Sequence, residues 1–482
     1  MFEYAPAPES VRPQIKEHYG LFIDGRFTDA ADGAVFKSLN PSTEEILFTV
    51  AEAGEADVRA AVAAARRAQE AVWGPMSGTE RGKYLFRIAR LLQERAREFA
   101  VAESLDNGKP IKETRDFDVP TAAQHFFYHA GWADKLAFAV PGFAGQGPGG
   151  ADPKPLGVVG QVIPWNFPIL MLAWKIAPAL ACGNTVVLKP AETTPLTALM
   201  FAELCQEADL PPGVVNILPG AGATGSALVN SPVDKVAFTG STAVGRAIAK
   251  AVAGSKKKVT LELGGKAANI VFDDAAIDQA VEGIVNGIFF NQGHVCCAGS
   301  RLLVQESVAE EVLARLKERV STLRVGDPLD KNTDIGAINS AEQLARITGL
   351  AKVGEEEGAD VWQPACDLPE RGFWFRPTVF TGVQQSMRIA QEEIFGPVLS
   401  VLTFRTPDEA ISKANNTPYG LSAGVWTEKG SKILWAAERL RAGVVWANTF
   451  NQFDAASPFG GLKESGYGRE GGRQGLEAYL DV

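Results

Sequence analysis

The sequence predicts an α/β protein in which a doubly wound parallel sheet is joined to a second α/β unit. Three observations lead to this prediction. The chain has 482 residues, which is too many for a single hydrophobic core. Between residues 156 and 245, strand-like apolar runs alternate with helix-like runs at intervals of roughly 25 to 30 residues, as in parallel sheets. The alternation begins again after Gly264 and Gly265.

Two helices are expected before the sheet. Residues 55–73 are rich in alanine, and from Thr79 to Phe99 apolar residues recur at steps of three and four, which is the period of an amphipathic helix. We expect these helices to form an N-terminal lobe that ends near the Asn107–Gly108 turn.

The first sheet follows from the alternation itself. Parallel strands joined by right-handed helical crossovers form a sheet of the nucleotide-binding kind. The expected strands are residues 157–163, 185–188, 214–218 and 236–239, and the expected helices are residues 167–181 and 196–208.

The second unit repeats the pattern. Strands are expected at residues 268–272 and 302–304, and helices at 277–290 and 308–323. A pair of cysteines, Cys296 and Cys297, falls in the loop between the helix at 277–290 and the strand at 302–304. Residues 142–154 are rich in glycine and proline and predict a loop or a weak hairpin.

Composition narrows the classes of function. The net charge of -10 argues against nucleic acid or an anionic membrane surface as the main partner, so a small molecule is the expected ligand. The five cysteines have no CxxC spacing, and the four histidines form no HExxH pair, so no metal site is expected. No secretory leader or long apolar span is recognisable, which predicts a cytoplasmic protein.

Two roles are possible for Cys296 and Cys297 when the loop is considered alone. Small residues and glycines around them would let a carbonyl carbon approach a nucleophilic sulfur. Free cysteines are also common as small buried hydrophobes, and the loop by itself does not decide between these readings.

Other motifs point to a nucleotide and to an oxyanion, each with a plainer alternative. The turn from Phe238 to Gly245 has the small residues that a pyrophosphate site needs, or it is only a tight turn. Lys189 and Glu192 follow a strand of the same sheet, where Glu192 would accept hydrogen bonds from a ribose and repel a 2′-phosphate; the alternative is a solvated loop. Asn166 is a neutral donor suited to an oxyanion, or a helix cap.

Glu262 is a single carboxylate among apolar neighbours. Partial burial would raise its pKa and suit it to activate water.

Together these motifs resemble the NAD(P)-dependent aldehyde dehydrogenase superfamily over nearly the whole chain. They occur in that family's order and spacing: PWNFP (164–168), LKPAE (188–192), FTGST (238–242), LELGGK (261–266), the Cys296 loop, EEIFGP (392–397) and SPFGG (457–461).

The resemblance implies a role for each residue. Cys296 would be the nucleophile, Asn166 would hold the oxyanion, and Glu262 would be the general base. The implied cofactor is NAD rather than NADP, bound by Ile163, Pro164, Trp165, Lys189, Glu192, Gly222, Gly225, Phe238, Gly240, Ser241, Gly245, Leu263, Glu393 and Phe395. The implied substrate pocket is Phe167, Trp174, Phe290, Val295, Cys297, Phe453 and Phe459, although aromatic residues there are equally explained by packing.

The implied reaction oxidises an aldehyde to a carboxylic acid. A thiohemiacetal forms on Cys296, loses hydride to the cofactor, and becomes a thioester that water hydrolyses. Because Glu262 is present, hydrolysis is favoured over transfer of the acyl group to coenzyme A. The aromatic pocket favours uncharged aldehydes. A non-catalytic protein that keeps the fold is the alternative, and the presence of all three catalytic residues argues against it.

The resemblance also implies domains. A cofactor domain would comprise residues 1–132 and 153–264, and a catalytic domain residues 265–450. Residues 133–152 and 451–482 would bridge them and serve oligomerisation.

Two features depart from the family pattern. His294 stands where Gln or Glu is usual; packing is the favoured reading, and assistance to thiolate formation is the alternative. The family's chain usually continues past the segment matching residues 478–482 with a strand that pairs across the dimer, whereas this sequence stops there, and the hairpin that receives the strand corresponds to residues 142–154, which have poor strand character. We therefore expect a weakened homodimer or a separate partner chain, which sedimentation velocity would test.

Overall fold

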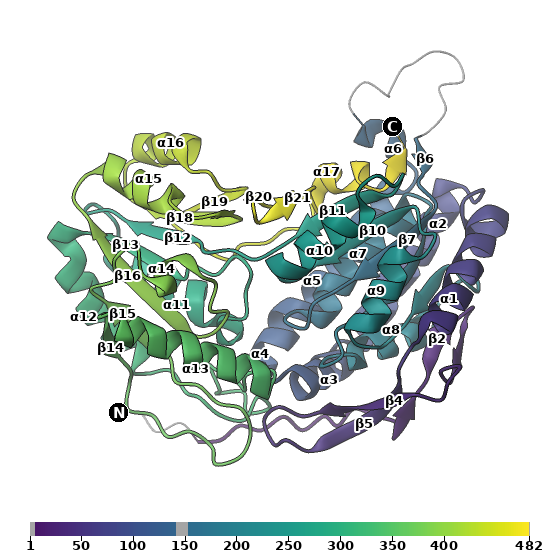
Figure 1. Ribbon diagram of the computed structural model, residues 1–482, viewed down its shortest axis with the longest axis horizontal. Helices are drawn as coiled ribbons and strands as arrows, with labels where there is room; N and C mark the ends of the chain where they lie inside the picture. Colours follow the sequence, from purple (N-terminus) through teal and green to yellow (C-terminus); the bar gives the residue numbers. More distant parts are fainter. Residues whose placement is uncertain (1–4, 141–152, 482) are drawn as a thin grey trace.

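The computed structural model describes residues 5–140 and 153–481, and Figure 1 shows two lobes, each built on its own sheet. In the described residues the first sheet has the strand order β21-β11-β10-β7-β8-β9-β2-β3, and its middle strands, from β11 to β9, are parallel. The strands are β2 (Leu21–Ile23), β3 (Arg26–Thr28), β7 (Val158–Val162), β8 (Thr185–Lys189), β9 (Val215–Ile217), β10 (Lys235–Thr239), β11 (Lys258–Glu262) and β21 (Gly466–Tyr467).

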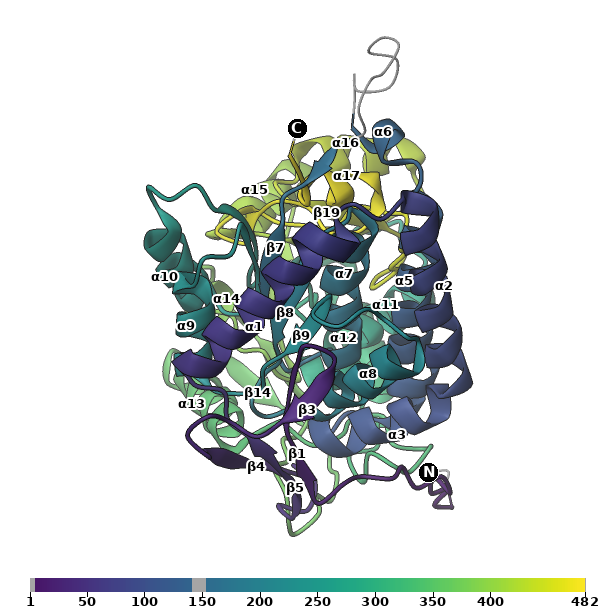
Figure 2. The same cartoon turned by 90° about the vertical axis from the view of Figure 1, so that its right-hand side faces the viewer.

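Helices cover both faces of this sheet, as Figure 2 shows, so the doubly wound prediction is confirmed. One face carries α1 (Glu55–Ala68), α9 (Gly222–Asn230) and α10 (Thr242–Val252). The other carries α7 (Pro168–Ala181) and α8 (Leu196–Glu207), with α2 (Gly78–Glu94), α3 (Ala96–Asn107) and α5 (Val119–Trp132) packed outside them. Every residue of α7 is buried, because it lies between the sheet and the outer helices.

Two details of the first helices differ from the prediction. The expected helix from Thr79 to Phe99 is two helices, because Arg95, with φ -97° and ψ 13°, departs from helical geometry. The two helices are also not a lobe of their own, because α1 packs on β8 of the first sheet and α2 packs on α5. The alanines of α1, several of them fully buried, allow this close approach.

After β11 the chain leaves the first sheet and enters the second at β12, which confirms the second α/β unit. Its strand order is β14-β15-β16-β13-β12-β18-β19, parallel except at β14. The strands are β12 (Ala268–Val271), β13 (Arg301–Gln305), β14 (Asp360–Trp362), β15 (Thr378–Thr381), β16 (Val398–Phe404), β18 (Ser422–Trp426) and β19 (Val444–Ala447). The helices around it are α11 (Ile277–Phe289), α12 (Ala309–Val320), α13 (Ala341–Glu356), α14 (Arg388–Gln391), α15 (Pro407–Asn415) and α16 (Gly430–Arg439).

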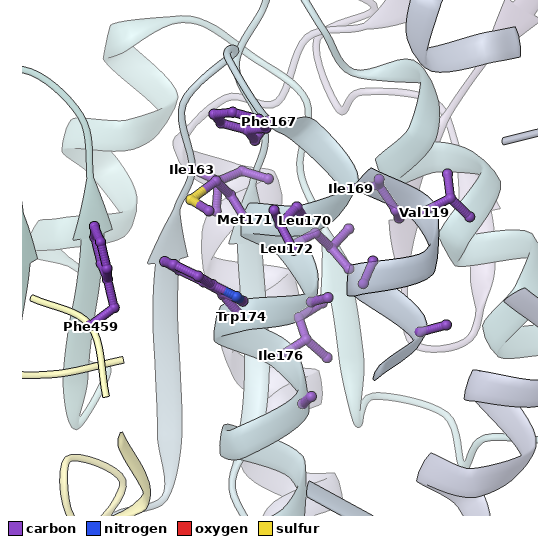
Figure 3. Close-up of a cluster of buried hydrophobic side chains, with 14 of the residues drawn as sticks. Val119, Ile163, Phe167, Ile169, Leu170, Met171, Leu172, Trp174, Ile176 and Phe459 are labelled. Atoms are coloured by element: carbon purple, nitrogen blue, oxygen red, sulfur yellow. The ribbon is translucent and has the colours of Figure 1, made fainter. Parts of the chain in front are cut away.

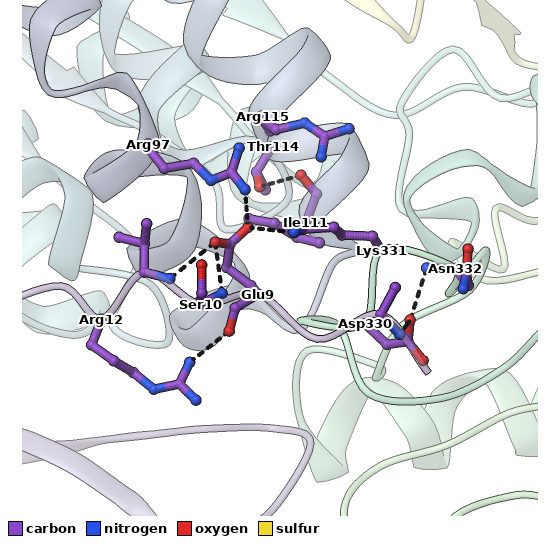
Figure 4. Close-up of polar contacts among 12 residues, drawn as sticks. Glu9, Ser10, Arg12, Arg97, Ile111, Thr114, Arg115, Asp330, Lys331 and Asn332 are labelled. Carbon is purple, nitrogen blue, oxygen red and sulfur yellow. Dashed lines mark hydrogen bonds and ion pairs between the residues drawn. The ribbon is translucent and has the colours of Figure 1, made fainter. Parts of the chain in front are cut away.

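The N-terminal segment is tied to both lobes through Glu9. Its buried carboxylate accepts hydrogen bonds from the backbone N–H groups of Ser10 and Val11 and forms ion pairs with Arg97 on α3 and Lys331 in the second lobe (Figure 4). A third sheet follows, made of β1 (His18–Tyr19), β5 (Ile46–Ala51) and β4 (Val35–Leu39).

The C-terminal segment returns across the two lobes. It contains β20 (Leu462–Lys463), which pairs with β17 (Tyr419–Gly420), and α17 (Gly472–Glu477). It then ends in β22 (Leu480–Asp481), which pairs with β6 (Lys154–Pro155). Most of the predicted loop at 142–154 lies outside the described residues. A search of residues 5–140 and 153–481 finds no helix with the length and apolar character needed to cross a bilayer.

Candidate active site

A cavity of about 430 Å³ lies where the carboxyl ends of β7, β10 and β11 face the loop that precedes β13. The first sheet therefore contributes strand ends and the second contributes the cysteine loop. Cys296, Glu262 and Asn166, the three candidate catalytic residues, all line this cavity.

The cysteine loop needs an unusual backbone. After α11, Asn291 and Gln292 have φ angles of 49° and 52°, and Gly293 has φ 73°. A Cβ atom at Gly293 would lie 2.1 Å from the carbonyl oxygen of Gly396, so only glycine fits there. This turn carries the chain from α11 back over the cavity and presents Cys296 to it.

The two cysteines occupy different environments. Cys296 is half-buried, whereas Cys297 is fully buried and its thiol lies 3.7 Å from Oδ1 of Asn451. The adjacent Cys297 thiol, followed by burial, raises the pKa of Cys296 well above its ordinary value. In this state the Cys296 thiol is protonated at neutral pH, and a nucleophilic role requires a group that removes the proton.

Glu262 ends β11 beside Thr239 of β10. Its carboxylate is buried, and neither oxygen has a hydrogen-bond partner among the described residues. Burial and then the nearby Glu470 raise the pKa of Glu262 well above its ordinary value. Glu470 itself forms a buried ion pair with Lys175. An unpartnered carboxyl with a raised pKa is suited to take a proton near neutral pH.

Asn166 follows β7 in the loop that leads into α7. Its side-chain Nδ2 donates a hydrogen bond to the carbonyl oxygen of His294, at 2.9 Å. A primary amide has two N–H donors, so one remains after this bond. The bond also fixes which end of the amide is the nitrogen.

The predicted cofactor residues divide into two groups. Those that line the cavity are Pro164, Trp165, Gly240, Ser241, Leu263, Glu393 and Phe395. Those that do not are Ile163, Lys189, Glu192, Gly222, Gly225, Phe238 and Gly245. The second group belongs to the ends of β7, β8 and β10 and to the first turns of α9 and α10, along the same edge of the first sheet.

This edge has a polar part and a close-packed part. Lys189 donates a hydrogen bond to the carbonyl oxygen of Gly220 at 2.6 Å and lies 3.4 Å from the half-exposed Glu192 carboxylate. Burial lowers the pKa of Lys189. A Cβ atom at Gly245 would lie 2.4 Å from a Leu263 methyl group, so α10 approaches β11 closely only because residue 245 is glycine.

Glu393 and Phe395 close the cavity from the second lobe. The Glu393 carboxylate accepts a hydrogen bond from the backbone N–H of Gly265 at 2.9 Å, and burial raises its pKa to about 7. Phe395 has φ 58°, which is a strained conformation for this residue, and Gln343 donates a hydrogen bond to its carbonyl oxygen at 2.8 Å.

The opposite wall is aromatic. Trp174 on α7 is turned toward Phe459 (Figure 3), with ring centroids 5.4 Å apart, and Phe453 lies 5.7 Å from Phe459. Phe167, Val295 and Cys297 also line this side of the cavity. Phe290 is outside the lining and packs edge-on against Phe117 at 5.4 Å.

Several residues that line the cavity were not predicted from the sequence. Phe117 belongs to a short π-helix, Thr114–Asp118, and Leu170 and Met171 are on α7. Glu342, Gln343 and Arg346 come from α13, where the sequence carries no motif. They reach the cavity because α13 packs against the Phe395 loop. In this contact Arg346 donates a hydrogen bond to the Glu393 carbonyl oxygen at 2.9 Å.

The chain is similar to known proteins over nearly its whole length. The model of the aldehyde dehydrogenase family matches residues 27–482. The chain is 46% identical to an aldehyde dehydrogenase of Alternaria alternata over 472 residues, covering 97% of this chain and 95% of that protein. It is 47% identical to retinal dehydrogenase 2 of Homo sapiens over 467 residues, covering 96% of this chain and 90% of that protein. A solved NAD+ complex of an aldehyde dehydrogenase from Bacillus cereus superposes with a TM-score of 0.94 at 42% identity, covering 98% of each chain.

Proposed function

The chain belongs to the aldehyde dehydrogenase family and is an enzyme that oxidises aldehydes; from this premise we propose that it uses NAD and a covalent intermediate on Cys296. The observation that supports the proposal most is the meeting of three groups on one cavity: the half-buried Cys296 thiol, the Asn166 amide and the unpartnered Glu262 carboxyl. This set supplies a nucleophile, an oxyanion donor and a base.

Acylation begins when the Cys296 thiol gives up its proton to water in the cavity and the sulfur bonds to the aldehyde carbon. The carbonyl oxygen becomes an oxyanion, which the free N–H of the Asn166 amide and the backbone N–H of Cys296 stabilise. As the oxyanion re-forms its carbonyl bond, the hydrogen on that carbon leaves as hydride, and a thioester remains on Cys296. When bound, NAD supplies the acceptor for this hydride.

Deacylation depends on Glu262. Its carboxylate removes a proton from water as the water oxygen attacks the thioester carbon. The carbon–sulfur bond then breaks, which frees the carboxylic acid and the Cys296 thiolate.

The nucleotide would lie along the carboxyl edge of the first sheet. The N-termini of α9 and α10 present backbone N–H groups and the small residues Gly222 and Ser241 to a pyrophosphate. Lys189 and the half-exposed Glu192 would hold the adenosine ribose, where the Glu192 carboxylate disfavours the 2′-phosphate of NADP. The solved Bacillus cereus relative is an NAD+ complex, which agrees with this choice. We assign the cofactor domain to residues 1–132 and 153–264 and the catalytic domain to residues 265–450.

The substrate we propose is an uncharged aldehyde with an aliphatic or aromatic body. An apolar wall is formed by Trp174, Phe453 and Phe459. Apart from Glu262, the charged residues that line the cavity are Glu393, on the cofactor side, and two residues of α13.

The experiment that tests this function follows reduced-cofactor absorbance with NAD and a panel of aldehydes. Cys296→Ala should abolish turnover, since the intermediate cannot form. Cys297→Ala is the matched control, one residue away and of the same size change, and should retain most of the activity. Equal loss in both variants, or turnover by Cys296→Ala, would refute the assignment.

A further inference from the structure

The two donors proposed for the oxyanion come from different lobes. The Asn166 amide is in the loop after β7 of the first sheet, and the Cys296 backbone N–H is in the loop before β13 of the second. Donors of this kind stabilise an oxyanion only when both are held at hydrogen-bond distance from the same point. A contact that fixes one loop against the other is therefore needed.

Asn291 makes such a contact. Its side-chain Nδ2 donates hydrogen bonds to the carbonyl oxygen of Asn166 at 2.7 Å and to that of His294 at 3.2 Å. The His294 oxygen also accepts the Asn166 side-chain amide. One buried amide thus joins the backbone of both loops. In the cysteine loop it bonds to His294, two residues before the nucleophile, and in the loop after β7 it bonds to Asn166, the oxyanion donor itself.

Buried ionisable side chains hold both Asn291 and the Asn166 carbonyl oxygen. Oε2 of Glu113 accepts the backbone N–H of Asn291 at 3.0 Å. Nζ of Lys109 lies 3.3 Å from the Asn166 carbonyl oxygen and pairs with the Asp118 carboxylate at 2.5 Å. Both Lys109 and Asp118 are fully buried and Glu113 is nearly so, so solvent does not compete for these bonds.

We propose that Asn291 is a positioning residue that sets the distance between the two halves of the oxyanion hole, with Glu113 as its backbone anchor. This inference rests on the proposed function only in the identity of the oxyanion donors. It goes further by assigning their alignment to a residue that touches neither the substrate nor the cofactor.

The residue type fits the task. Asn291 has φ 49°, in the left-handed region that asparagine and glycine tolerate best. Asn291→Gly therefore permits the same backbone conformation and removes the side chain that carries the amide. Asn291→Asp keeps the shape but replaces the donor with an acceptor that faces two carbonyl oxygens.

The test separates oxyanion stabilisation from thiol reactivity. Cleavage of p-nitrophenyl acetate by Cys296 passes through a tetrahedral oxyanion and needs no cofactor, whereas alkylation of Cys296 by iodoacetamide, followed by peptide mass spectrometry, has no oxyanion. Asn291→Gly should lower kcat/KM for the ester by roughly 10- to 100-fold, within the range for a lost or misplaced donor. The alkylation rate should change less than about 2-fold, since the thiol is untouched.

Glu113 supplies a second pair of variants. Glu113→Gln keeps an oxygen acceptor for the Asn291 N–H and should cleave the ester nearly as fast as wild type. Glu113→Leu removes the acceptor and should show the selective loss seen in Asn291→Gly. The inference is overturned if Asn291→Gly cleaves the ester at the wild-type rate, if ester cleavage and alkylation fall equally, or if Cys296→Ala leaves ester cleavage unchanged.

The proposed function fails by a different result. It fails if wild-type protein forms no reduced cofactor with any aldehyde, whereas the ester and alkylation assays still report on the oxyanion hole.

Discussion

At the scale of single residues, the neighbours Cys296 and Cys297 show what packing adds to sequence. The loop composition alone leaves both cysteines as candidate nucleophiles or as buried hydrophobes. Both cysteines line the cavity, but the fold separates them by exposure, since Cys296 is half-buried and Cys297 is fully buried. The resemblance to a family also selects Cys296, but the raised pKa of its thiol, caused by Cys297 and burial, emerges only from the three-dimensional arrangement.

His294 is the residue that departs from the family pattern, and the structure favours a packing role. The imidazole is fully buried between Trp165 and Phe395, with ring centroids at 4.8 and 5.9 Å. Burial, and then the charge of Lys109, lower its pKa to about 3. The ring is therefore neutral at physiological pH and does not supply a positive charge to the thiolate.

His294→Gln should leave the pH dependence of acylation unaltered between about pH 5 and 9, because no imidazole titrates there. The measurement is the pre-steady-state rate of hydride transfer across this range in both proteins. A wild-type titration near the ordinary imidazole pKa of about 6.5 that disappears in the variant would show that His294 is protonated during catalysis.

At the scale of elements, the sequence pattern predicted β7 to β10, β12 and β13 and the helices α1, α7, α8, α11 and α12, but it named no element after α12 and missed how the helices end and pack. The break at Arg95 carries no glycine or proline, so nothing in the sequence separates α2 from α3. The π-helix Thr114–Asp118 likewise has no sequence signature, yet it brings Phe117 to the cavity and encloses the Asp118 carboxyl. These features depend on packing between elements distant in the chain.

The same region predicts an unusual dependence of stability on pH. Burial raises the pKa of Glu113 to about 8, above its ordinary value of 4.5. Between these values the unfolded chain releases a proton that the folded protein keeps. The stability associated with Glu113 is therefore fully present below about pH 4.5 and is lost as pH rises through about 8.

Glu113→Gln should remove this dependence while keeping an acceptor for Asn291. Relative to wild type, its melting temperature should rise by a few degrees, roughly 2–5 °C, from pH 5 to pH 8.5. Differential scanning calorimetry over that range, with exposed Glu310→Gln as the control, measures the effect. A difference between Glu113→Gln and wild type that stays constant with pH would mean that Glu113 is ionised in the folded protein.

At the scale of the whole molecule, the site exists because the carboxyl edge of one sheet faces the loop before β13 of the other. The two α/β units and the nucleophile loop could be predicted from the sequence, since alternating strands and helices and short motifs are local signals. Arg346 and its neighbours on α13 could not, because their place depends on how α13 packs against the Phe395 loop.

Binding of NAD should stabilise the whole molecule, since the nucleotide would bridge the first sheet and the Glu393 loop. At a concentration 100 times the Kd the expected gain is about 2.7 kcal/mol. Thermal melting should show a larger shift with NAD than with NADP, because Glu192 disfavours the 2′-phosphate. Glu192→Ser should narrow that difference, whereas equal shifts with both nucleotides in the wild type would contradict the role of Glu192.

The central claim is that an acyl group is carried on Cys296 and released by Glu262. Rapid quenching of Glu262→Gln after mixing with NAD and an aldehyde, followed by peptide mass spectrometry, tests it directly. We predict a burst of one equivalent of reduced cofactor per active site, slow turnover afterwards, and an acyl adduct on the peptide at Cys296. The account would be contradicted by an adduct on another residue. It would also be contradicted if Glu262→Gln turned over at the wild-type rate without accumulating an adduct.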